Sequence, residues 1–181
     1  MEQPGRETGV WTIGHSTLAL DAFLSLLQLN EIKVLADVRS FPSSRRYPHF
    51  NRVALKSSLE SSGIEYVHLP ELGGRRKARS DSVNIAWRNE SFRGYADYME
   101  TDAFRDGIER LLAIADNKRA AIMCAEAVWW KCHRSLISDF LKASGANVIH
   151  INSTASTTPH PYTSAARIID GRLSYRSLFV L

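Results

Sequence analysis

Short apolar runs alternate with segments of helical periodicity along most of the chain, and this alternation predicts the fold. The apolar runs predict strands over residues 10–16, 34–39, 64–69, 120–125 and 148–151. Apolar residues at helical spacing predict helices over 20–29, 51–62, 94–99, 102–115 and 135–141. Strands that alternate with helices favour a mostly parallel sheet with helices on both faces. The pattern therefore predicts one α/β domain over residues 1–181, three-layered and Rossmann-like.

Helix boundaries and loops follow from turn-forming residues. Asn51 is placed to cap its helix, and Gly63 and Gly145 to end theirs. Residues 72–92 form a long polar and basic segment, and loops of this length are commonly functional or disordered. Residues 153–164 are rich in Ser, Thr and Pro, which predicts a second loop. The tail from Leu173 to the end is expected to add a short edge strand.

Polar residues collect where the predicted strands end. The carboxyl ends of parallel strands meet at one edge of a sheet, so these residues are expected to line one cleft there. They are His15, Ser16, Asp37, Arg39, His68, Glu71, Cys124, Glu126 and His150.

The densest chemistry lies between Cys124 and Arg134. A helix that starts near His133 would offer free N–H groups and a positive dipole end to an anion. The same field would lower the pKa of Cys132, and Arg134 could grip a phosphate or carboxylate. The alternative is a buried cysteine that only packs, beside an arginine paired with a neighbouring acid. Cys124 and Cys132 precede Arg134 by ten and two positions, which excludes the spacing of a cysteine-phosphatase loop.

Two acids and a histidine complete the predicted site. Glu126 is a candidate general acid or base, or else an ion-pair partner of Arg39 or Arg134. Asp37 stands between apolar neighbours, so its charge needs a partner, for which Arg39 is the nearest candidate. Gly14 would let a ligand approach the backbone beside His15. The predicted catalytic residues are Glu126, Cys132, Cys124 and His15, and the predicted anion-binding residues are Arg39, Arg134, His133, Ser16, Asp37 and Arg75.

Composition limits the setting of this chemistry. Hydrophobic residues make up 44% of the 181 residues and charged residues 23%, as in globular proteins. No apolar run reaches the roughly 18 residues of a membrane span, and the N-terminus lacks the order of a signal peptide, so a cytoplasmic protein is expected. Two cysteines are too few for a disulfide framework. The residues require no cofactor and define no metal site, although a divalent metal is compatible with them. The oligomeric state is left open.

Net charge is +4 and the pI is near 9.2, which suits a phosphate-bearing ligand. Cations and aromatic residues mix over residues 45–51, and cations recur over 75–79, as on surfaces that bind phosphates and stacked bases. Trp129 and Trp130 add flat apolar area, with core packing as the competing role for at least one of them.

Three motifs in combination resemble a known family. They are Thr12–Ser16, Asp37–Arg39, and Cys124-x-Glu126 leading to Cys132–Arg134, and the stretches 69–75 and 92–98 fit as well. Together they are similar to the uncharacterised family catalogued as domain of unknown function 488. The resemblance implies an α/β domain with the motif residues gathered at one site, and it implies no reaction.

These observations lead to one main hypothesis and two alternatives. The main hypothesis is an enzyme that acts on a phosphorylated or nucleic-acid-derived substrate. The alternatives are a non-catalytic nucleotide- or nucleic-acid-binding module, and thiol-based redox or sulfur chemistry through Cys124 and Cys132.

Overall fold

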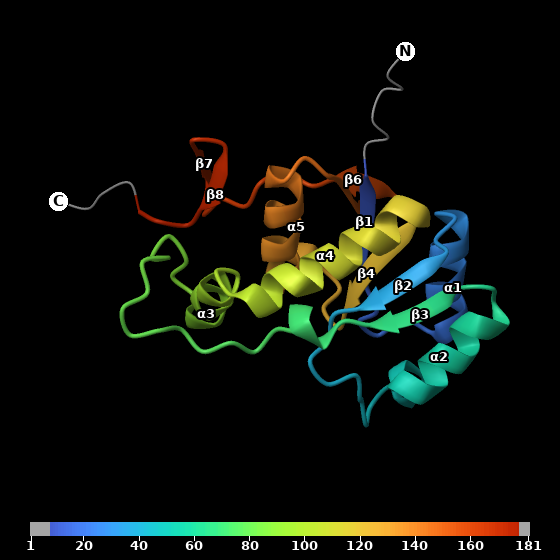
Figure 1. The fold of residues 1–181 in the computed structure, drawn as a ribbon. Helices are drawn as coiled ribbons and strands as arrows, with labels where there is room; N and C mark the ends of the chain where they lie inside the picture. The colour runs from blue at the N-terminus through green and yellow to red at the C-terminus, as the bar shows by residue number, and fades with distance from the viewer. Residues whose placement is uncertain (1–7, 178–181) are drawn as a thin grey trace, which may run out of the picture.

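A six-stranded sheet forms the centre of the computed structural model, which describes residues 8–177 (Figure 1). The strand order is β3-β2-β4-β1-β5-β6. The first five strands along the chain pair in parallel, and β6 runs antiparallel to β5. The bounds are β1 Gly9–Gly14, β2 Val34–Asp37, β3 Glu65–His68, β4 Ala120–Cys124, β5 Asn147–Ile151 and β6 Thr157–Pro159. The five predicted strands are thus all present.

Helices cover both faces of this sheet. They are α1 Leu20–Leu29, α2 Arg52–Ser61, α3 Glu90–Tyr98, α4 Asp102–Asn117 and α5 Arg134–Ala143, with short 3₁₀ turns η1 Pro48–Phe50, η2 Pro70–Leu72 and η3 Trp129–Lys131. One core joins the sheet to α1 and α2, and a second core joins the opposite face to α3, α4 and α5. The α/β class and the mostly parallel, helix-flanked sheet are confirmed, whereas the Rossmann-like detail stays a prediction.

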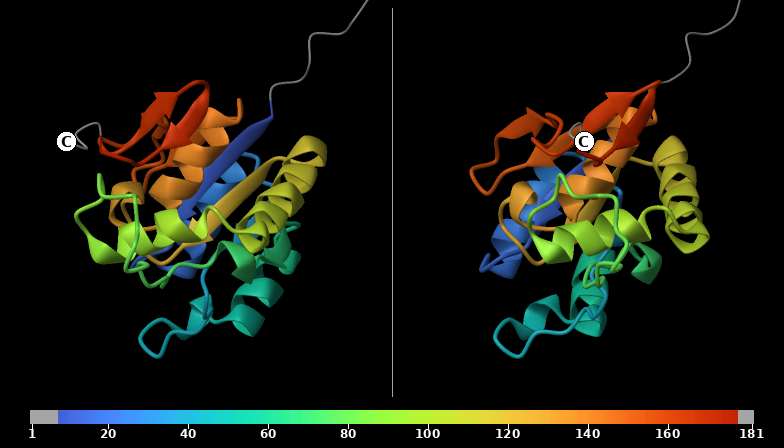
Figure 2. Two further views of the ribbon diagram at one scale, coloured as in Figure 1. Left: turned by 60° about the vertical axis from the view of Figure 1, so that its left-hand side comes forward. Right: turned by 90° about the vertical axis from the view of Figure 1, so that its left-hand side faces the viewer.

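The order of the strands creates a point where the chain leaves neighbouring strands in opposite directions. From β1 and β2 the chain passes to α1 and α2 on one face, whereas from β4, which lies between them, it passes to α5 on the other. Loops that part in this way leave a crevice beyond the strand ends, where open α/β sheets bind their ligands. The segment between β2 and α2 projects away from the sheet in both views of Figure 2.

The long connection between η2 and α3 is pinned to the body of the domain. Asp97 is buried and accepts hydrogen bonds from the backbone N–H of Arg79 and the side chains of Ser82 and Asn84. A side chain at Gly94 would collide with the backbone of Arg76 and the residues that follow it, since its Cβ would lie 2.3 Å from the Arg76 carbonyl oxygen. This basic segment is therefore held against α3 by a buried carboxylate.

Three local features differ from the sequence-based expectation. The segment 153–164, expected as loop, contains β6 on the edge of the sheet. The described part of the tail, with β8 Arg172–Ser174, pairs with β7 Arg167–Ile169 in a separate ribbon instead of joining the main sheet, and residues 178–181 lie outside the described residues. Asn51 precedes α2 as expected, but its side-chain oxygen accepts from the Ser44 N–H rather than from the helix.

Within residues 8–177, no helix has both the length and the apolar character that crossing a membrane requires.

Candidate functional site

A cleft of about 570 Å³ opens beyond the carboxyl ends of β1, β2 and β4, at the point where the loops part. The predicted site residues that line it are His15, Ser16, Arg39, Arg75, Cys124, Glu126, Cys132 and His133. Asp37 and Arg134, also predicted, do not line it. Both are buried, each in contact with one of the residues on the cleft wall.

Gly14 allows the loop after β4 to fold across the end of β1. A Cβ at this position would lie 1.7 Å from the Glu126 carbonyl oxygen and 2.7 Å from the Arg134 guanidinium. The group that approaches Gly14 is thus the protein's own backbone, whereas the sequence suggested a ligand. This close approach places the Cys124 and Glu126 region directly beside His15.

Two sulfur atoms form the floor of the cleft. Sγ of Cys124 lies 2.9 Å from Sγ of Cys132, and both cysteines are free thiols. They are only 2% and 7% exposed, so the contact is shielded from bulk water. The β4 strand supplies the first cysteine and the turn between η3 and α5 supplies the second, which explains how residues eight positions apart meet.

Arg134 lies directly behind Cys132 and holds the loop in place. Its Nε donates to Sγ of Cys132 at 3.3 Å, and its backbone N–H points to the same sulfur at 3.4 Å. The terminal nitrogens donate to the carbonyl oxygens of Glu126 and Ala127 and to the hydroxyl of Thr12. Arg134 is 1% exposed, so it does not reach a ligand in the cleft as the sequence suggested.

The two thiols have opposite pKa shifts. Burial raises the pKa of the Cys124 thiol well above its usual value, and the neighbouring Cys132 adds to this rise. For Cys132 burial acts in the same direction, but the hydrogen bond from Cys124 and the charge of Arg134 outweigh it and lower its pKa to about 6. Cys132 is therefore a thiolate at neutral pH that accepts a hydrogen bond from the Cys124 thiol.

Asp37 and Arg39 form a buried ion pair at the end of β2. Nε and a terminal nitrogen of Arg39 donate to the two carboxylate oxygens at 2.9 and 2.6 Å. Tyr66 donates its hydroxyl to the same carboxylate at 2.7 Å. The guanidinium of Arg39 is on the cleft wall, but its charge is already matched by Asp37. The pairing expected from the sequence is present, and it leaves Arg39 little free charge for a ligand.

His15 is a neutral imidazole with a defined tautomer. Its Nδ1 lies 3.0 Å from the Ser16 carbonyl oxygen, to which it donates, so Nε2 accepts from Arg39 at 3.3 Å. Burial and the charge of Arg39 lower its pKa to about 4. The ring also stacks on Phe50, with centroids 4.1 Å apart. His15 therefore presents a fixed, uncharged ring to the cleft.

His133 and His68 fasten the loop that follows β2. Nε2 of His133 donates to the Val38 carbonyl oxygen at 3.0 Å, and Nε2 of His68 donates to the Arg39 carbonyl oxygen at 2.9 Å. Burial lowers the pKa of His133 to about 4, so it carries no positive charge at neutral pH. His133 was predicted to bind an anion. It offers the cleft only a neutral ring, and its Nε2 already donates to the Val38 carbonyl oxygen.

Exposed charges lie on the rim of the cleft. Glu126, Arg75, Arg46 and Lys131 are all exposed lining residues. Glu126 forms no salt bridge within residues 8–177, so the ion pair considered from the sequence is not formed there. Phe41 is 71% exposed beside Arg75, whose guanidinium carbon lies 6.0 Å from its ring centre.

The sequence did not single out Arg46 and Lys131 as site residues, nor His160 and Asp139 behind the cleft. Two further polar residues lie behind the cleft with them: Thr12, which the sequence offered only as part of the Thr12–Ser16 motif, and His150, which it offered as a polar residue at a strand end. Arg46 had a signal in the basic, aromatic segment 45–51. Asp139 had one as well, because it is a charged residue among the apolar positions of the predicted helix 135–141. The connections among the four residues depend on side-chain geometry, which no spacing along the chain reveals.

Trp129 and Trp130 have different environments. Trp129 is half-buried and stacks on His150, with ring centroids 4.5 Å apart and planes 4° apart. Trp130 is 54% exposed. The packing role expected for at least one tryptophan is thus that of Trp129.

Among residues 8–177, no group of three or more His, Cys, Asp and Glu side chains is arranged to hold a metal ion.

Comparison with known proteins gives one match. A family model described as "Domain of unknown function DUF488" matches residues 19–141. No curated protein and no solved structure matches the chain. The matched range includes the β2 exit, the β4 exit and most of α5, and ends after Asp139 and Leu141.

Proposed function

This chain belongs to the DUF488 family, and from that premise and the geometry of its cleft we propose an enzyme that acts on a phosphorylated or nucleic-acid-derived substrate with Cys132 as nucleophile. The observation that carries the proposal is the position of the Cys132 sulfur. It lies on the cleft floor, 2.9 Å from the Cys124 sulfur and 3.3 Å from Nε of a buried arginine.

A buried arginine next to a thiol supports nucleophilic chemistry for an electrostatic reason. Arg134 forms no salt bridge with a carboxylate in the part of the chain that the structure describes. A buried cation without a counter-ion is costly, and the Cys132 thiolate is the anion in contact with it. The protein therefore stabilises the reactive form of the thiol at the point where a ligand can reach it.

The rim of the cleft supports an anionic substrate. Arg46, Arg75 and Lys131 are exposed cations around the opening, and no fixed carboxylate neutralises them within the described residues. Such cations attract phosphate groups over a distance of about one Debye length, roughly 8–10 Å at physiological salt. The exposed ring of Phe41 offers a flat apolar surface next to Arg75.

The proposed reaction has two steps. The Cys132 sulfur forms a bond to the electrophilic atom of the substrate while the bond to the leaving group breaks, and the leaving group departs with its electron pair. Glu126, exposed on the rim, then accepts a proton from the water that displaces Cys132 and regenerates the thiolate. His15 stays neutral and orients the reacting group through its fixed ring.

A thermal-shift screen against nucleotides, short nucleic acids and sugar phosphates tests the substrate class. A ligand present at 100 times its Kd should add about 2.7 kcal/mol to the free energy of unfolding. Lys131→Gln should weaken the hit about tenfold, whereas the control Lys56→Gln, an exposed lysine on α2, should not. Turnover of the hit should disappear in Cys132→Ser and in Glu126→Gln. Full turnover in Cys132→Ser would refute the proposed nucleophile.

A second candidate function, dithiol redox chemistry, is favoured by the sulfur–sulfur distance. A disulfide requires about 2.05 Å between the sulfur atoms, so closing the 2.9 Å contact needs a displacement below 1 Å. Two electrons and two protons would then pass to a substrate disulfide, which becomes two thiols. Cys124→Ser separates the two candidates. A serine hydroxyl still donates a hydrogen bond to Cys132 and preserves nucleophilic turnover, but it abolishes dithiol exchange.

A further inference from the structure

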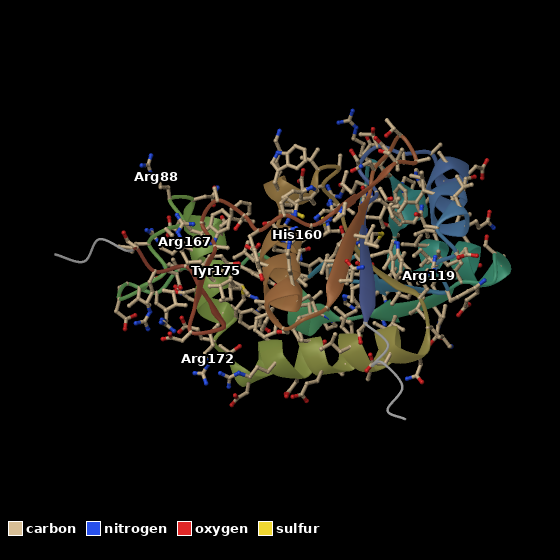
Figure 3. The ribbon with its side chains drawn as sticks, turned by 90° about the horizontal axis from the view of Figure 1, so that it is seen from above. Arg88, Arg119, His160, Arg167, Arg172 and Tyr175 are labelled. Carbon is tan, nitrogen blue, oxygen red and sulfur yellow. The ribbon has the colours of Figure 1, made fainter. Side chains whose placement is uncertain are left out.

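Four polar side chains lie in a row behind the cleft, outside the mechanism described above. Thr12 is on β1, His150 on β5, His160 directly after β6 and Asp139 on α5. None of the four is more than 2% exposed. Seen from above in Figure 3, His160 lies over α5 and Tyr175 beside the β7–β8 ribbon. Burial on this scale demands that every polar atom find a partner.

The row is a continuous hydrogen-bond chain that starts at Arg134. The Arg134 guanidinium donates to Oγ1 of Thr12 at 3.4 Å. Oγ1 of Thr12 lies 2.7 Å from Nδ1 of His150, and Nε2 of His150 lies 2.8 Å from Nδ1 of His160. Nε2 of His160 lies 3.0 Å from Oδ1 of Asp139.

The direction of every bond in this chain is fixed by its ends. Arginine has no acceptor, so the Thr12 oxygen accepts from it, and with both rings neutral the acceptor-only carboxylate of Asp139 at the far end requires Thr12 to give its own proton to Nδ1 of His150. His150 must then carry its proton on Nε2 and donate to His160, which in turn donates from Nε2 to Asp139. Burial, together with His160 and Arg134, lowers the pKa of His150 to about 3, in agreement with a neutral ring. All donors therefore point from the cation towards the carboxylate.

The carboxylate end is fully occupied. Oδ1 of Asp139 accepts from His160 and from the Thr163 N–H at 2.9 Å. Oδ2 accepts from the Thr163 hydroxyl at 2.6 Å and from the Tyr175 hydroxyl at 2.8 Å. Lys142 binds the backbone oxygen of His160 and does not contact the carboxylate. Four donors leave Asp139 no freedom to turn, so it anchors the chain at a fixed point.

At the other end, the chain determines which nitrogens of Arg134 remain for the sulfur. One terminal nitrogen is used by Thr12 and the other by the carbonyl oxygens of Glu126 and Ala127, which leaves Nε to Cys132. Among the described residues, Cys132 interacts electrostatically with Cys124 from β4, Arg134 from α5 and Tyr95 from α3, whose burial raises the pKa of its hydroxyl well above the usual value. We propose that the chain Thr12–His150–His160–Asp139 is positioning machinery that holds the Arg134 cation against the Cys132 sulfur and thereby keeps this thiol ionised.

Rigid neighbours support this role. Thr12 and His150 face each other across the paired strands β1 and β5, where they are register partners. The ring of Trp129 stacks on His150 and meets His160 edge-on at 5.0 Å, so η3, which directly precedes Cys132, packs against the same hydrogen-bond chain. Both ends of the chain lie on α5, at Arg134 and Asp139. A break in the chain would let the guanidinium turn without unfolding the helix.

This inference rests on the proposed function, because it concerns the same nucleophile, but its test needs no substrate. The full-length protein is alkylated with iodoacetamide between pH 5 and 9, and the modified cysteine is identified by mass spectrometry. In the wild type, Cys132 should react with a midpoint near pH 6. Thr12→Val removes the hydroxyl while keeping the shape, and should raise this midpoint by about one unit towards the ~8.5 of a free thiol. At pH 6.5 the rate should fall roughly threefold.

Matched variants separate positioning from general damage. Thr12→Ser restores the hydroxyl and should restore the wild-type midpoint. Ser138→Ala removes a buried hydroxyl on α5 that has no hydrogen-bond partner in the described residues. It should leave the alkylation midpoint of Cys132 unchanged. If Thr12→Val fails to fold, His160→Asn provides the second break, because it keeps an acceptor for His150 and loses the donor to Asp139.

The possible failures can be distinguished. A wild-type midpoint near 6 that Thr12→Val and His160→Asn leave unchanged overturns the positioning role and leaves the proposed nucleophile intact. A wild-type midpoint near 8.5 overturns both, since no ionised thiol would then exist for the chain to maintain. A midpoint that rises equally in Thr12→Val and Thr12→Ser also overturns the positioning role, because the hydroxyl would not be the cause.

Discussion

Two buried arginines lie at the base of the same cleft, and they are neutralised in different ways. Arg39 is clamped by both oxygens of Asp37, whose carboxylate also accepts from Tyr66. Arg134 has no carboxylate partner within residues 8–177 and lies against the sulfur of Cys132. The first pair satisfies its charge permanently. The second depends on a group that gains or loses its charge near neutral pH.

The difference separates structure from chemistry in a single site. A carboxylate held by two arginine nitrogens and a tyrosine hydroxyl shapes the end of β2, and its bonds leave it unavailable for reaction. A thiolate held by one arginine nitrogen, a backbone N–H and a thiol remains nucleophilic, because sulfur is only weakly engaged by such donors. Changes at the Asp37 pair should therefore affect stability without changing the ionisation of Cys132, and changes at the Cys132 pair should affect both stability and reactivity.

Breaking the Asp37 pair should have the largest effect. Asp37→Asn leaves the Arg39 cation at a buried position without its counter-charge, which should cost about 3–5 kcal/mol of unfolding free energy. Urea denaturation measures this loss. The alkylation midpoint of Cys132 should remain near 6, because neither Asp37 nor Arg39 contacts the sulfur.

Tyr66→Phe is the matched control for this variant. It removes one hydrogen bond from the same carboxylate and keeps the charge pair, so it should cost only about 1 kcal/mol. Equal losses in Asp37→Asn and Tyr66→Phe would mean that the ion pair contributes no more than a neutral hydrogen bond, and the contrast between the two arginines would lose its basis.

Breaking the Arg134 pair should cost less stability and change the chemistry. In Arg134→Gln no charge is left unpaired, because Cys132 becomes a neutral thiol, but the carbonyl oxygens of Glu126 and Ala127 lose their donor. Unmade bonds of this kind should cost about 2–3 kcal/mol together. The Cys132 midpoint should rise by about two units, measured by alkylation. Arg134→Lys, which keeps the charge but not the fork of donors, should give an intermediate midpoint, and an unchanged midpoint in Arg134→Gln would contradict the pairing.

The strands and helices could be predicted because their signal is local. Each predicted strand forms over four to six residues and contains buried apolar positions, most clearly in the fully buried Ala120–Cys124, and α1 begins and ends at the predicted residues. β6 escaped prediction because its sequence, Thr-Thr-Pro, is exposed at every residue and owes its conformation to pairing with β5. An edge strand of this kind has no apolar pattern of its own to detect.

The site shows the same limit at the level of single residues. Convergence at the strand ends followed from the parallel topology, so Cys124, Glu126 and His15 could be placed together from the sequence. The orientation of Arg134 could not, since spacing does not show that Gly14 lets the loop close over it. The hydrogen-bond chain that links Thr12, His150, His160 and Asp139 depends on atoms brought together from β1, β5 and α5, and only the folded geometry shows it.

The pH dependence of stability gives the most selective test of the contrast. The pKa of Cys132 is lowered by folding from 9.0 to about 6, so the unfolded chain binds its proton more readily between these values. Stability from this thiolate is complete above pH 9 and is lost as the pH falls towards 6, at up to about 1.4 kcal/mol per pH unit. Cys124, whose pKa is raised, acts with the opposite sign only above pH 9. His15, His133 and His150 have lowered pKa values in the folded protein. The unfolded chain therefore binds more protons at these residues only below pH 6.5, and they lower the stability only there.

Urea denaturation between pH 7 and 9 therefore isolates the Cys132–Arg134 pair. The wild type should become more stable across this range, and Cys132→Ser, which has no thiolate to form, should show a flat profile. Asp37→Asn should keep the wild-type slope at lower overall stability, because the thiolate pair is intact in it. If the stability of Cys132→Ser still rises between pH 7 and 9, another group titrates in this range. The contrast between Arg134, paired with an ionisable thiol, and Arg39, paired with a carboxylate, would then be contradicted.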